Sequence, residues 1–452
     1  MTWRIIFERT VFMAFTFRGG IHVDEHKDTA SSQIKTMPTP AKVAIPLSQH
    51  IGAPVLPLVK KGDSVKMGQV IGRNDDALSC PVHASVSGTV VDIEQRNSYT
   101  SGGKTTYIVI ESDGKDELDE SIAPFGKPLE EATLEDIVNV VRNAGISGMG
   151  GATFPTYAKI SSAAGKVTDL IVNCAECEPY ITANHRLMLE DAESVVYGAK
   201  ILMHALGLGK VTLAIEDNKK DAIKLLRDFT SEDDSVEIAV LKTKYPQGDE
   251  RQIIYALKKT ELPAGKLPAD VGCVLFNTET CAAVRHAFYE GMPLIRRIVT
   301  VAGDCIKEPA NLSVPLGTSF DDVIAFCGGF SKQPERLVNG GPMMGFAQWD
   351  MNAVVTKGTS ALLALSPEKI KKTEPNCIHC GRCISACPMH LMPNYLAAFS
   401  AKGDYDTCES FNAMSCVECG CCTYTCPGNV PIVQHIRVAK GKIREKKNKL
   451  KK

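Results

Sequence analysis

The chain has 452 residues, of which 44% are hydrophobic and 23% are charged, a composition typical of a globular protein with about three domains. Lys and Arg number 51 against 52 Asp and Glu, so the net charge of -1 provides no basic field and disfavours binding to nucleic acid. No run approaches the roughly 18 apolar residues of a membrane span, and the N-terminus lacks the pattern of a secretory signal. We expect residues 1–12 to be an extension before a start at Met13.

Residues 14–115 are predicted to form a first domain of short strands, because Val and Ile alternate there between turn signals. Residues 59–72 and 87–90 resemble the two halves of a lipoyl or biotinyl barrel sandwich. The expected tip, residues 78–85, contains Cys80 and His83 but no carrier lysine. We therefore interpret this domain as structural and not as a swinging arm.

Residues 128–290 change to an α/β pattern after a charged linker. Thr133 and Asp136 form a capping box ahead of a helix. The pattern predicts strands at 170–172, 211–215 and 236–241, and helices at 191–206 and 219–229. Alternating strands and helices of this kind build a parallel sheet.

Three smaller regions follow. Residues 293–345 are predicted to form a small αβ module, with a strand at 298–302 and a helix at 320–326. Residues 368–435 are rich in cysteine, and residues 436–452 form a basic tail. The tail is either solvated or a contact for anionic headgroups or an acidic partner.

The cysteine-rich region holds ten of the 17 cysteines, a crowding that indicates metal ligation in a reducing compartment and not a disulfide scaffold. It contains one four-cysteine run twice, as Cys377-x2-Cys380-x2-Cys383-x3-Cys387-Pro388 and Cys416-x2-Cys419-x2-Cys422-x3-Cys426-Pro427. In bacterial two-cluster ferredoxins the fourth cysteine of such a run binds the other cluster. We therefore predict two [4Fe–4S] clusters, and zinc is the weaker alternative. Cluster one takes Cys377, Cys380, Cys383 and Cys426. Cluster two takes Cys387, Cys416, Cys419 and Cys422.

A glycine-rich loop, residues 145–155, is the second strong signal. Gly148, Gly150 and Gly151 allow a ligand to approach the backbone, and Lys159 adds a charge one turn into the next helix. A dinucleotide fingerprint is absent, because Thr153 stands in place of its third glycine and the loop follows a helix. An ordinary Rossmann site is therefore disfavoured.

Three further motifs follow the loop in order. They are Asn173-Cys-Ala-Glu-Cys-Glu-Pro179, Tyr245-Pro-Gln-Gly-Asp-Glu250 and Phe276-Asn-Thr-Glu-Thr280. Together with the loop they resemble the flavin- and NADH-binding 51-kDa subunit of respiratory complex I. The sequence departs from that pattern at Ala175, Cys177, Tyr180 and Phe276.

The whole order of domains, with Phe17-Arg-Gly-Gly-Ile-His22 in front, resembles the RnfC family, one of the subunit families of the Rnf complex, which is an ion-pumping ferredoxin:NAD+ oxidoreductase. The resemblance implies a multidomain α/β fold. Its parts are a lipoyl-like barrel sandwich, a Rossmann-like FMN/NADH domain, a small SLBB-like β-grasp domain and a two-cluster ferredoxin domain. The resemblance also implies binding roles around FMN and NAD(H), and no catalytic acid or base is nominated. The implied binding residues are Gly148, Gly150, Gly151 and Lys159 for the FMN phosphate, Asn173 and Asn277 for the flavin, Phe154 for the adenine, and Glu176, Glu178, Tyr245, Asp249 and Glu250 around the cleft.

The implied function is that of a peripheral oxidoreductase subunit of a translocase on the cytoplasmic face of the cell membrane. It would pass electrons between NAD(H), FMN and two clusters, with the other Rnf subunits as partners and ferredoxin as an indirect one. A flavin belongs between a two-electron carrier and one-electron clusters. Carboxylates in the cleft would repel the extra phosphate of NADPH, so NADH is the expected nucleotide. The alternatives are a soluble NADH-dependent cobalamin reductase of the propanediol-utilisation type and a ferredoxin-like adaptor without nucleotide.

Overall fold

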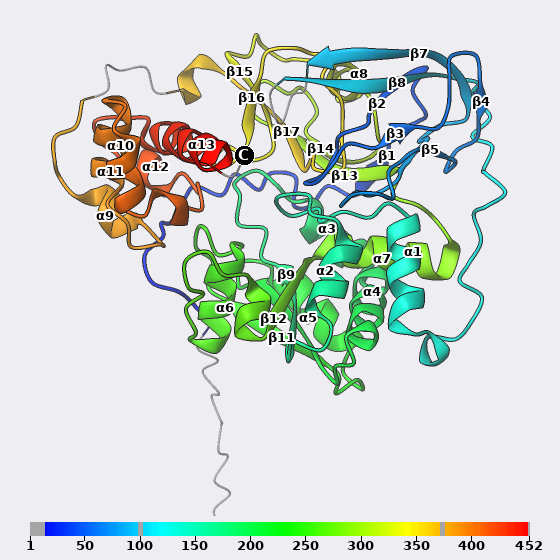
Figure 1. Ribbon diagram of the computed structural model, residues 1–452, viewed down its shortest axis with the longest axis horizontal. Coiled ribbons are helices and arrows are strands. Elements are labelled where there is room, and N and C mark those ends of the chain that lie inside the picture. The colour runs from blue at the N-terminus through cyan, green and yellow to red at the C-terminus, as the bar shows by residue number, and fades with distance from the viewer. Residues whose placement is uncertain (1–13, 98–102, 371–375, 451–452) are drawn as a thin grey trace, which may run out of the picture.

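The computed structural model describes residues 14–97, 103–370 and 376–450, so the expected extension and the start at Met13 lie outside the described residues. A barrel domain and a six-stranded sheet lie above a parallel α/β domain, and a helical cysteine-rich domain lies at one side (Figure 1). In the described residues no helix has the length and apolar character to cross a membrane. Short 3-10 turns occur at Leu129–Glu131, Pro268–Val271, Pro367–Lys369 and Ala413–Ser415.

The barrel domain packs two small sheets around an aliphatic core. Its strands are β2 (Lys42–Pro46), β3 (Leu56–Pro57), β4 (Ser64–Val65), β5 (Val70–Arg73), β6 (Val82–His83), β7 (Gly88–Asn97) and β8 (Lys104–Ser112). The sheet orders are β2-β8-β7-β4 and β3-β5-β6. Ile45, Ile71 and Ile108 are buried between them, as the alternation of Val and Ile predicts.

The α/β domain has a parallel sheet, as predicted, but with a fourth strand, β12 (Cys273–Asn277), that the sequence pattern did not predict. Its strands are β9 (Asp169–Cys174), β10 (Val211–Glu216), β11 (Val236–Leu241) and β12 (Cys273–Asn277). Its helices are α1 (Leu134–Asn143), α2 (Thr156–Ala163), α3 (Ala183–Glu190), α4 (Ala192–Ala205), α5 (Lys220–Phe229), α6 (Glu250–Lys258) and α7 (Thr278–Glu290). The predicted capping box of Thr133 and Asp136 begins α1. Because the strand order is β11-β10-β9-β12, the order reverses between β9 and β12, which is where open α/β sheets bind ligands.

The six-stranded sheet combines one strand from the N-terminal segment with five strands from residues 296–365. Its strands are β1 (Ile34–Thr36), β13 (Arg296–Ala302), β14 (Ala310–Pro315), β15 (Arg336–Asn339), β16 (Phe346–Gln348) and β17 (Ala361–Leu365), and α8 (Phe320–Phe326) packs on it. The order is β1-β14-β13-β17-β15-β16. The sheet therefore extends beyond the predicted boundary at residue 345, since β17 lies in its middle.

The N-terminal segment before the barrel is a strap that crosses the other domains. Phe15 pairs with Leu241 and Ile21 with Tyr245 at isolated bridges, and β1 then joins the six-stranded sheet beside β14. Residues 14–36 therefore lie outside the barrel, although the sequence places them in the same predicted domain.

The cysteine-rich domain is built from short helices around the two cysteine runs. Its helices are α9 (Arg382–Ala386), α10 (Pro393–Ala401), α11 (Tyr405–Ser410), α12 (Cys421–Tyr424) and α13 (Ile432–Leu450). The basic tail forms most of α13, and Ile436, Ala439 and Ile443 are buried in the domain core. Lys440 and Arg437 both pair with Glu418. The start of the tail is therefore part of the domain and not a solvated segment.

Candidate functional site: a flavin loop beside two cluster sites

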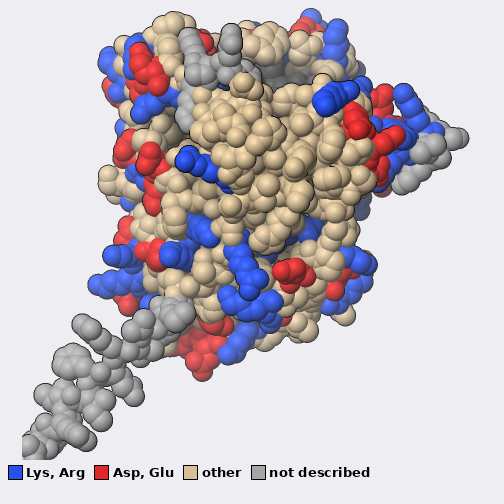
Figure 2. All heavy atoms as spheres, turned by 90° about the vertical axis from the view of Figure 1, so that its left-hand side faces the viewer, with Lys and Arg blue, Asp and Glu red and all other residues tan. Residues whose placement is uncertain are grey.

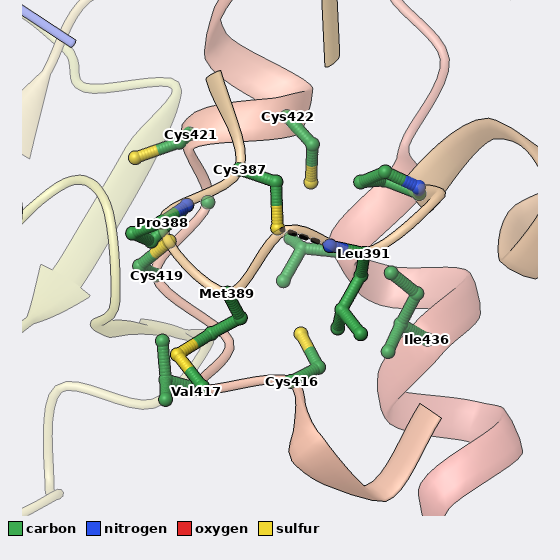
Figure 3. Close-up of a pocket in the computed structure, with 13 residues that line it drawn as sticks. Cys387, Pro388, Met389, Leu391, Cys416, Val417, Cys419, Cys421, Cys422 and Ile436 are labelled. Atoms are coloured by element: carbon green, nitrogen blue, oxygen red, sulfur yellow. Dashed lines mark hydrogen bonds between the residues drawn. The ribbon is translucent and has the colours of Figure 1, made fainter. Parts of the chain in front are cut away.

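The four cysteines assigned to cluster two surround one pocket. The pocket is lined by Cys387, Cys416, Cys419 and Cys422, and by apolar neighbours that include Met389, Leu391 and Ile436 (Figure 3). The thiols of Cys387 and Cys422 point into it, whereas that of Cys421 points away. Four thiols in an apolar pocket match the donor set of an iron–sulfur cluster. Cys421 Sγ instead lies 3.9 Å from the carbonyl of Tyr245.

The two runs share the same unusual backbone, which explains how they curl around a cluster. His379 and Glu418, the residues before the second cysteines, have φ of 55° and 57°, and Gly381 and Gly420 have φ of 76° and 80°. Backbone N–H groups then point to sulfur, as from Glu418 to Cys416 Sγ at 3.3 Å. The backbone of each run is therefore shaped to present its first three thiols to one group, while the fourth lies with the other run, as Cys387 does in the cluster-two pocket.

The two cluster sites differ in their surroundings. Of the cysteines predicted to bind cluster one, Cys377 and Cys380 are exposed, while Cys383 is buried. Burial raises the pKa of Cys416 in cluster two to about 11, so iron binding there must release a proton. Within the described residues, no three His, Cys, Asp or Glu side chains converge on a single-ion position.

The flavin motifs meet at the reversal point of the parallel sheet. Asn173 and Asn277 are register partners at the carboxyl ends of β9 and β12. Gly150 lies against Asn277, because a Cβ there would meet Asn277 Nδ2 at 2.8 Å. Gly148 N–H donates to Phe154 O at 2.9 Å and closes the loop. Exposed glycine backbone beside two amides fits a polar, phosphate-bearing group such as FMN.

Lys159 does not stand free beside the loop. Its Nζ donates to Glu250 Oε1 at 2.7 Å and lies 5.6 Å from the ring centre of Phe276. The first amide of α2, Thr156 N–H, is already bound to the carbonyl of Ile146 at 3.1 Å. The N-terminus of α2 is therefore closed at its first residue, while Gly150, Gly151 and Ala152 of the loop are exposed and Phe154 is half buried.

The acidic motif has two structural roles that the sequence did not predict. The carboxylate of Glu176 accepts the N–H groups of Asn184 and His185 and so caps α3. Lys27 from the strap donates to the carbonyls of Glu176 and Glu178 at 2.9 and 2.8 Å. Glu176 is thus engaged within the chain. The sequence around Glu176 gives no indication that this carboxylate caps α3.

Tyr245 lies where the α/β domain meets the cluster domain, and Glu178 lies beside it against the segment between β15 and β16. Glu178 accepts the N–H groups of Met343 and Met344 at 3.2 and 2.8 Å, and desolvation raises its pKa to about 7. The buried hydroxyl of Tyr245 donates to Cys419 O at 2.7 Å. Tyr245 therefore connects the flavin motifs to Cys419, whereas Glu178 connects them to the six-stranded sheet.

Asp249 begins α6 nearby, where its carboxylate accepts the N–H groups of Arg251 and Gln252. Desolvation raises the pKa of Asp249 to about 6. Gln252, on the same turn, contacts the sulfur of Met389 beside the cluster-two pocket. The motif from Tyr245 to Glu250 therefore spans the distance from Lys159 to the cluster domain.

Known protein families match the chain in four consecutive stretches. The matches are the RnfC barrel sandwich hybrid domain at residues 15–115, the Nuo51 FMN-binding domain at 141–286, the SLBB domain at 298–347 and the 4Fe-4S dicluster domain at 376–430. The multidomain α/β fold class and its four domain types are confirmed. An FMN-binding domain and a dicluster domain imply FMN and two [4Fe–4S] clusters.

A solved structure shares part of the fold. It is an NAD+-reducing [NiFe]-hydrogenase in the air-oxidized state, with a TM-score of 0.50 and 18% identity over 64% of this chain and 55% of that chain. Similarity at this level concerns the fold alone.

Curated relatives match over nearly the full length. The C subunit of the Na(+)-translocating ferredoxin:NAD(+) oxidoreductase complex of Acetobacterium woodii is 47% identical, over 95% of this chain and 97% of its own. Its proton-translocating counterpart from Clostridium ljungdahlii is 46% identical, over 96% and 95%. The C subunit of the ion-translocating oxidoreductase complex of Rhodobacter capsulatus is 43% identical, over 96% and 85%. With the FMN-type loop and the two cluster sites in one polypeptide, the chain belongs to the RnfC family, the C subunits of the ion-translocating ferredoxin:NAD(+) oxidoreductase (Rnf) complex.

Proposed function

We propose that this chain exchanges electrons with NAD(H) at FMN and passes them through two [4Fe–4S] clusters to or from other subunits of the complex. FMN, when bound, supplies the exchange between a two-electron carrier and one-electron clusters. One observation carries the proposal: Tyr245 begins the third flavin motif and bonds directly to the backbone of Cys419 at 2.7 Å. The two redox regions are therefore in contact within one chain.

The residues that would hold FMN are those around the reversal point of the sheet. The loop backbone at Gly148, Gly150 and Gly151 would receive the phosphate, and the amides of Asn173 and Asn277 would meet the flavin. Asn173 Nδ2 also donates to Gly248 O at 2.8 Å, which fixes the amide in place. The ligand would thus meet an amide that needs little reordering.

The nucleotide would lie on the side of Phe154 and Glu250. The ring of the half-buried Phe154 would stack on the adenine, and the Lys159–Glu250 ion pair would border the nucleotide. Glu250 can accept hydrogen bonds from ribose hydroxyls, and its charge disfavours a ribose phosphate. We therefore propose NADH and not NADPH. A higher affinity for NADPH would refute this choice.

Cluster two would lie toward the flavin and cluster one toward the partner. Met343 and Tyr245 pack with Cys419 and Cys421 in one apolar cluster, whereas Cys377, Ile378 and Cys380 are exposed. The face of the molecule on the side of the cysteine-rich domain has a broad area without Lys, Arg, Asp or Glu (Figure 2). An uncharged surface suits another subunit of the complex better than a freely diffusing acidic carrier. Ferredoxin would then be reached indirectly.

We place the chain at the cytoplasmic face of the membrane as a peripheral subunit. The proposed clusters depend on reduced thiols, which a reducing compartment maintains. NAD(H) would reach the chain from the same side.

The function is tested by titrating the anaerobically prepared chain with NADH, with and without FMN. The result expected is bleaching of the cluster absorbance only when FMN is present. Bleaching without FMN, or none in a preparation loaded with iron, sulfide and FMN, would overturn the proposal.

A further inference from the structure

The barrel domain has the form of a carrier domain, but its tip is buried. A carrier tip must be exposed to move its prosthetic group between sites. Here Cys80, Val82, His83, Ala84 and Ser85 each have at most 3% of their surface exposed. Residues 80–83 lie against the start of the glycine-rich loop and against Lys357 in the segment that precedes β17, and Ser85 Oγ donates to Leu316 O after β14.

Contacts between the tip and the loop are close. A Cβ on Gly145 would meet Pro81 O at 2.4 Å and His83 Cε1 at 3.1 Å. Cys80 Sγ lies 3.5 Å from Ile146 O. At the other end of the loop, Ile51 N–H of the barrel donates to Thr153 O at 3.3 Å. The barrel therefore holds both ends of the loop.

A lysine from a third domain joins the tip to the loop. Lys357 is fully buried, and its Nζ donates to Gly145 O at 2.6 Å and to Pro81 O at 2.8 Å. Its own N–H donates to Gln49 Oε1 of the barrel. Hydrogen bonds from a cation are roughly twice as strong as neutral ones. Burial lowers the pKa of Lys357 to about 8, so its ammonium remains the main form at neutral pH.

The middle of the loop is fastened separately. Thr280 Oγ1 accepts Met149 N–H at 3.1 Å, and the buried Arg297 donates to Met149 O at 3.4 Å. The glycines that face the proposed ligand therefore lie between residues, Gly145, Met149 and Thr153, that are held by hydrogen bonds to other parts of the chain. Preorganising a loop in this way reduces the entropy lost on binding.

We propose that the barrel domain, in place of carrying a prosthetic group, holds the FMN-binding loop in its binding conformation through Lys357. Lys357 is a positioning residue that touches the loop and not the ligand. The proposal rests on the proposed FMN site and adds a role for a domain that contributes no residue to it.

The first test is FMN binding to the flavin-stripped full chain, followed by quenching of flavin fluorescence. Lys357→Met removes the charge and both hydrogen bonds while nearly keeping the volume. We expect a dissociation constant for FMN at least about tenfold higher, since hydrogen bonds to charged groups contribute about 1.5–3 kcal/mol. Iron and sulfide content should not change.

Two glycine variants give a matched comparison. Gly145 and Gly207 have φ of +65° and +66°, so alanine causes similar backbone strain at both, but a Cβ on Gly207 meets nothing within 4 Å. Gly145→Ala should weaken FMN binding as Lys357→Met does. Gly207→Ala should leave the affinity within about twofold of the parent chain.

A barrel-core variant separates positioning from general loss of stability. Val90→Ala should lower the melting temperature of the barrel while keeping the parent affinity for FMN. Parent-like FMN affinity in both Lys357→Met and Gly145→Ala would overturn the inference. A loss of FMN affinity in Val90→Ala as large as that in Lys357→Met would also overturn it. If the parent chain itself does not bind FMN, the proposed function fails instead.

Discussion

The two redox regions of this chain are assembled in different ways. The proposed cluster sites take eight cysteines from one short segment, and the first three cysteines of each run lie on backbone with matching φ values. The proposed flavin site takes Asn173 and Asn277 from two strands that the parallel sheet brings together, and Gly150 from a loop that packs against Asn277. The cluster domain therefore depends on local spacing, whereas the flavin site depends on the packing of several domains.

A second difference lies between the two cluster sites. The cluster-two cysteines line a pocket against the α/β domain, and two of the cluster-one cysteines are exposed. The repeat in the sequence is nearly symmetric, but its surroundings are not. The fold thus assigns one site to the interior contact and the other to the surface.

The largest expected effect is a loss of iron, which should distinguish a proposed ligand, Cys422, from its neighbour Cys421. Cys422→Ser should remove about half of the iron, because each cluster needs four thiolates. Cys421→Ser should keep it, since the thiol of Cys421 points away from the pocket. Iron and sulfide analysis of anaerobic preparations checks both, and an equal loss in the two variants would refute the assignment of ligands.

The next prediction concerns how folding stability depends on pH through the buried carboxyl of Glu178. Because the pKa of Glu178 is raised to about 7, the native state binds this proton more tightly than the unfolded state does. Its contribution to stability is present below about pH 4.5 and is lost as pH rises through 7, by at most about 3 kcal/mol. Glu178→Gln should remove this loss and raise the melting temperature relative to the parent chain at pH 8 but not at pH 5.

Asp249→Asn is the matched control for that measurement. The pKa of Asp249 is raised to about 6, so its contribution is lost at lower pH than that of Glu178. If Glu178→Gln and the parent chain show the same pH profile of melting temperature, the buried position of Glu178 is not maintained in solution.

A smaller effect should appear in the flavin loop. Gly150→Ala places a Cβ 2.8 Å from Asn277 Nδ2, so the loop or the amide must move. We expect FMN binding weaker by about tenfold, with unchanged iron content. Gly209→Ala, where a Cβ meets nothing within 4 Å, is the control and should bind FMN normally. Titration of flavin fluorescence checks the pair.

The smallest effect concerns the bond between the regions. Tyr245→Phe removes the hydrogen bond to the carbonyl of Cys419, at a cost of about 1 kcal/mol. We expect a lower melting temperature and slower bleaching of the clusters by NADH, with FMN binding and iron content intact. Tyr255→Phe on α6 is the control. Equal rates in the two variants would show that the hydroxyl does not couple the regions.

The sequence predicted those features that depend on local chemistry. The capping box of Thr133, the parallel strands and the cysteine spacing all follow from neighbouring residues. The same approach could not find that Glu176 caps α3 or that Lys357 holds the loop, because these contacts join residues that the sequence pattern does not relate to one another. The positions of β1 and β17 in one sheet were missed for the same reason.

The most direct test of the proposed electron path asks which cluster NADH reduces when each one is removed in turn. FMN-loaded Cys383→Ser, without cluster one, and Cys422→Ser, without cluster two, are mixed with NADH anaerobically and followed by EPR. Dithionite shows that the remaining cluster is intact in each. We expect a reduced cluster in Cys383→Ser and little or none in Cys422→Ser. Equally fast reduction of cluster one in Cys422→Ser would contradict the path from flavin through cluster two.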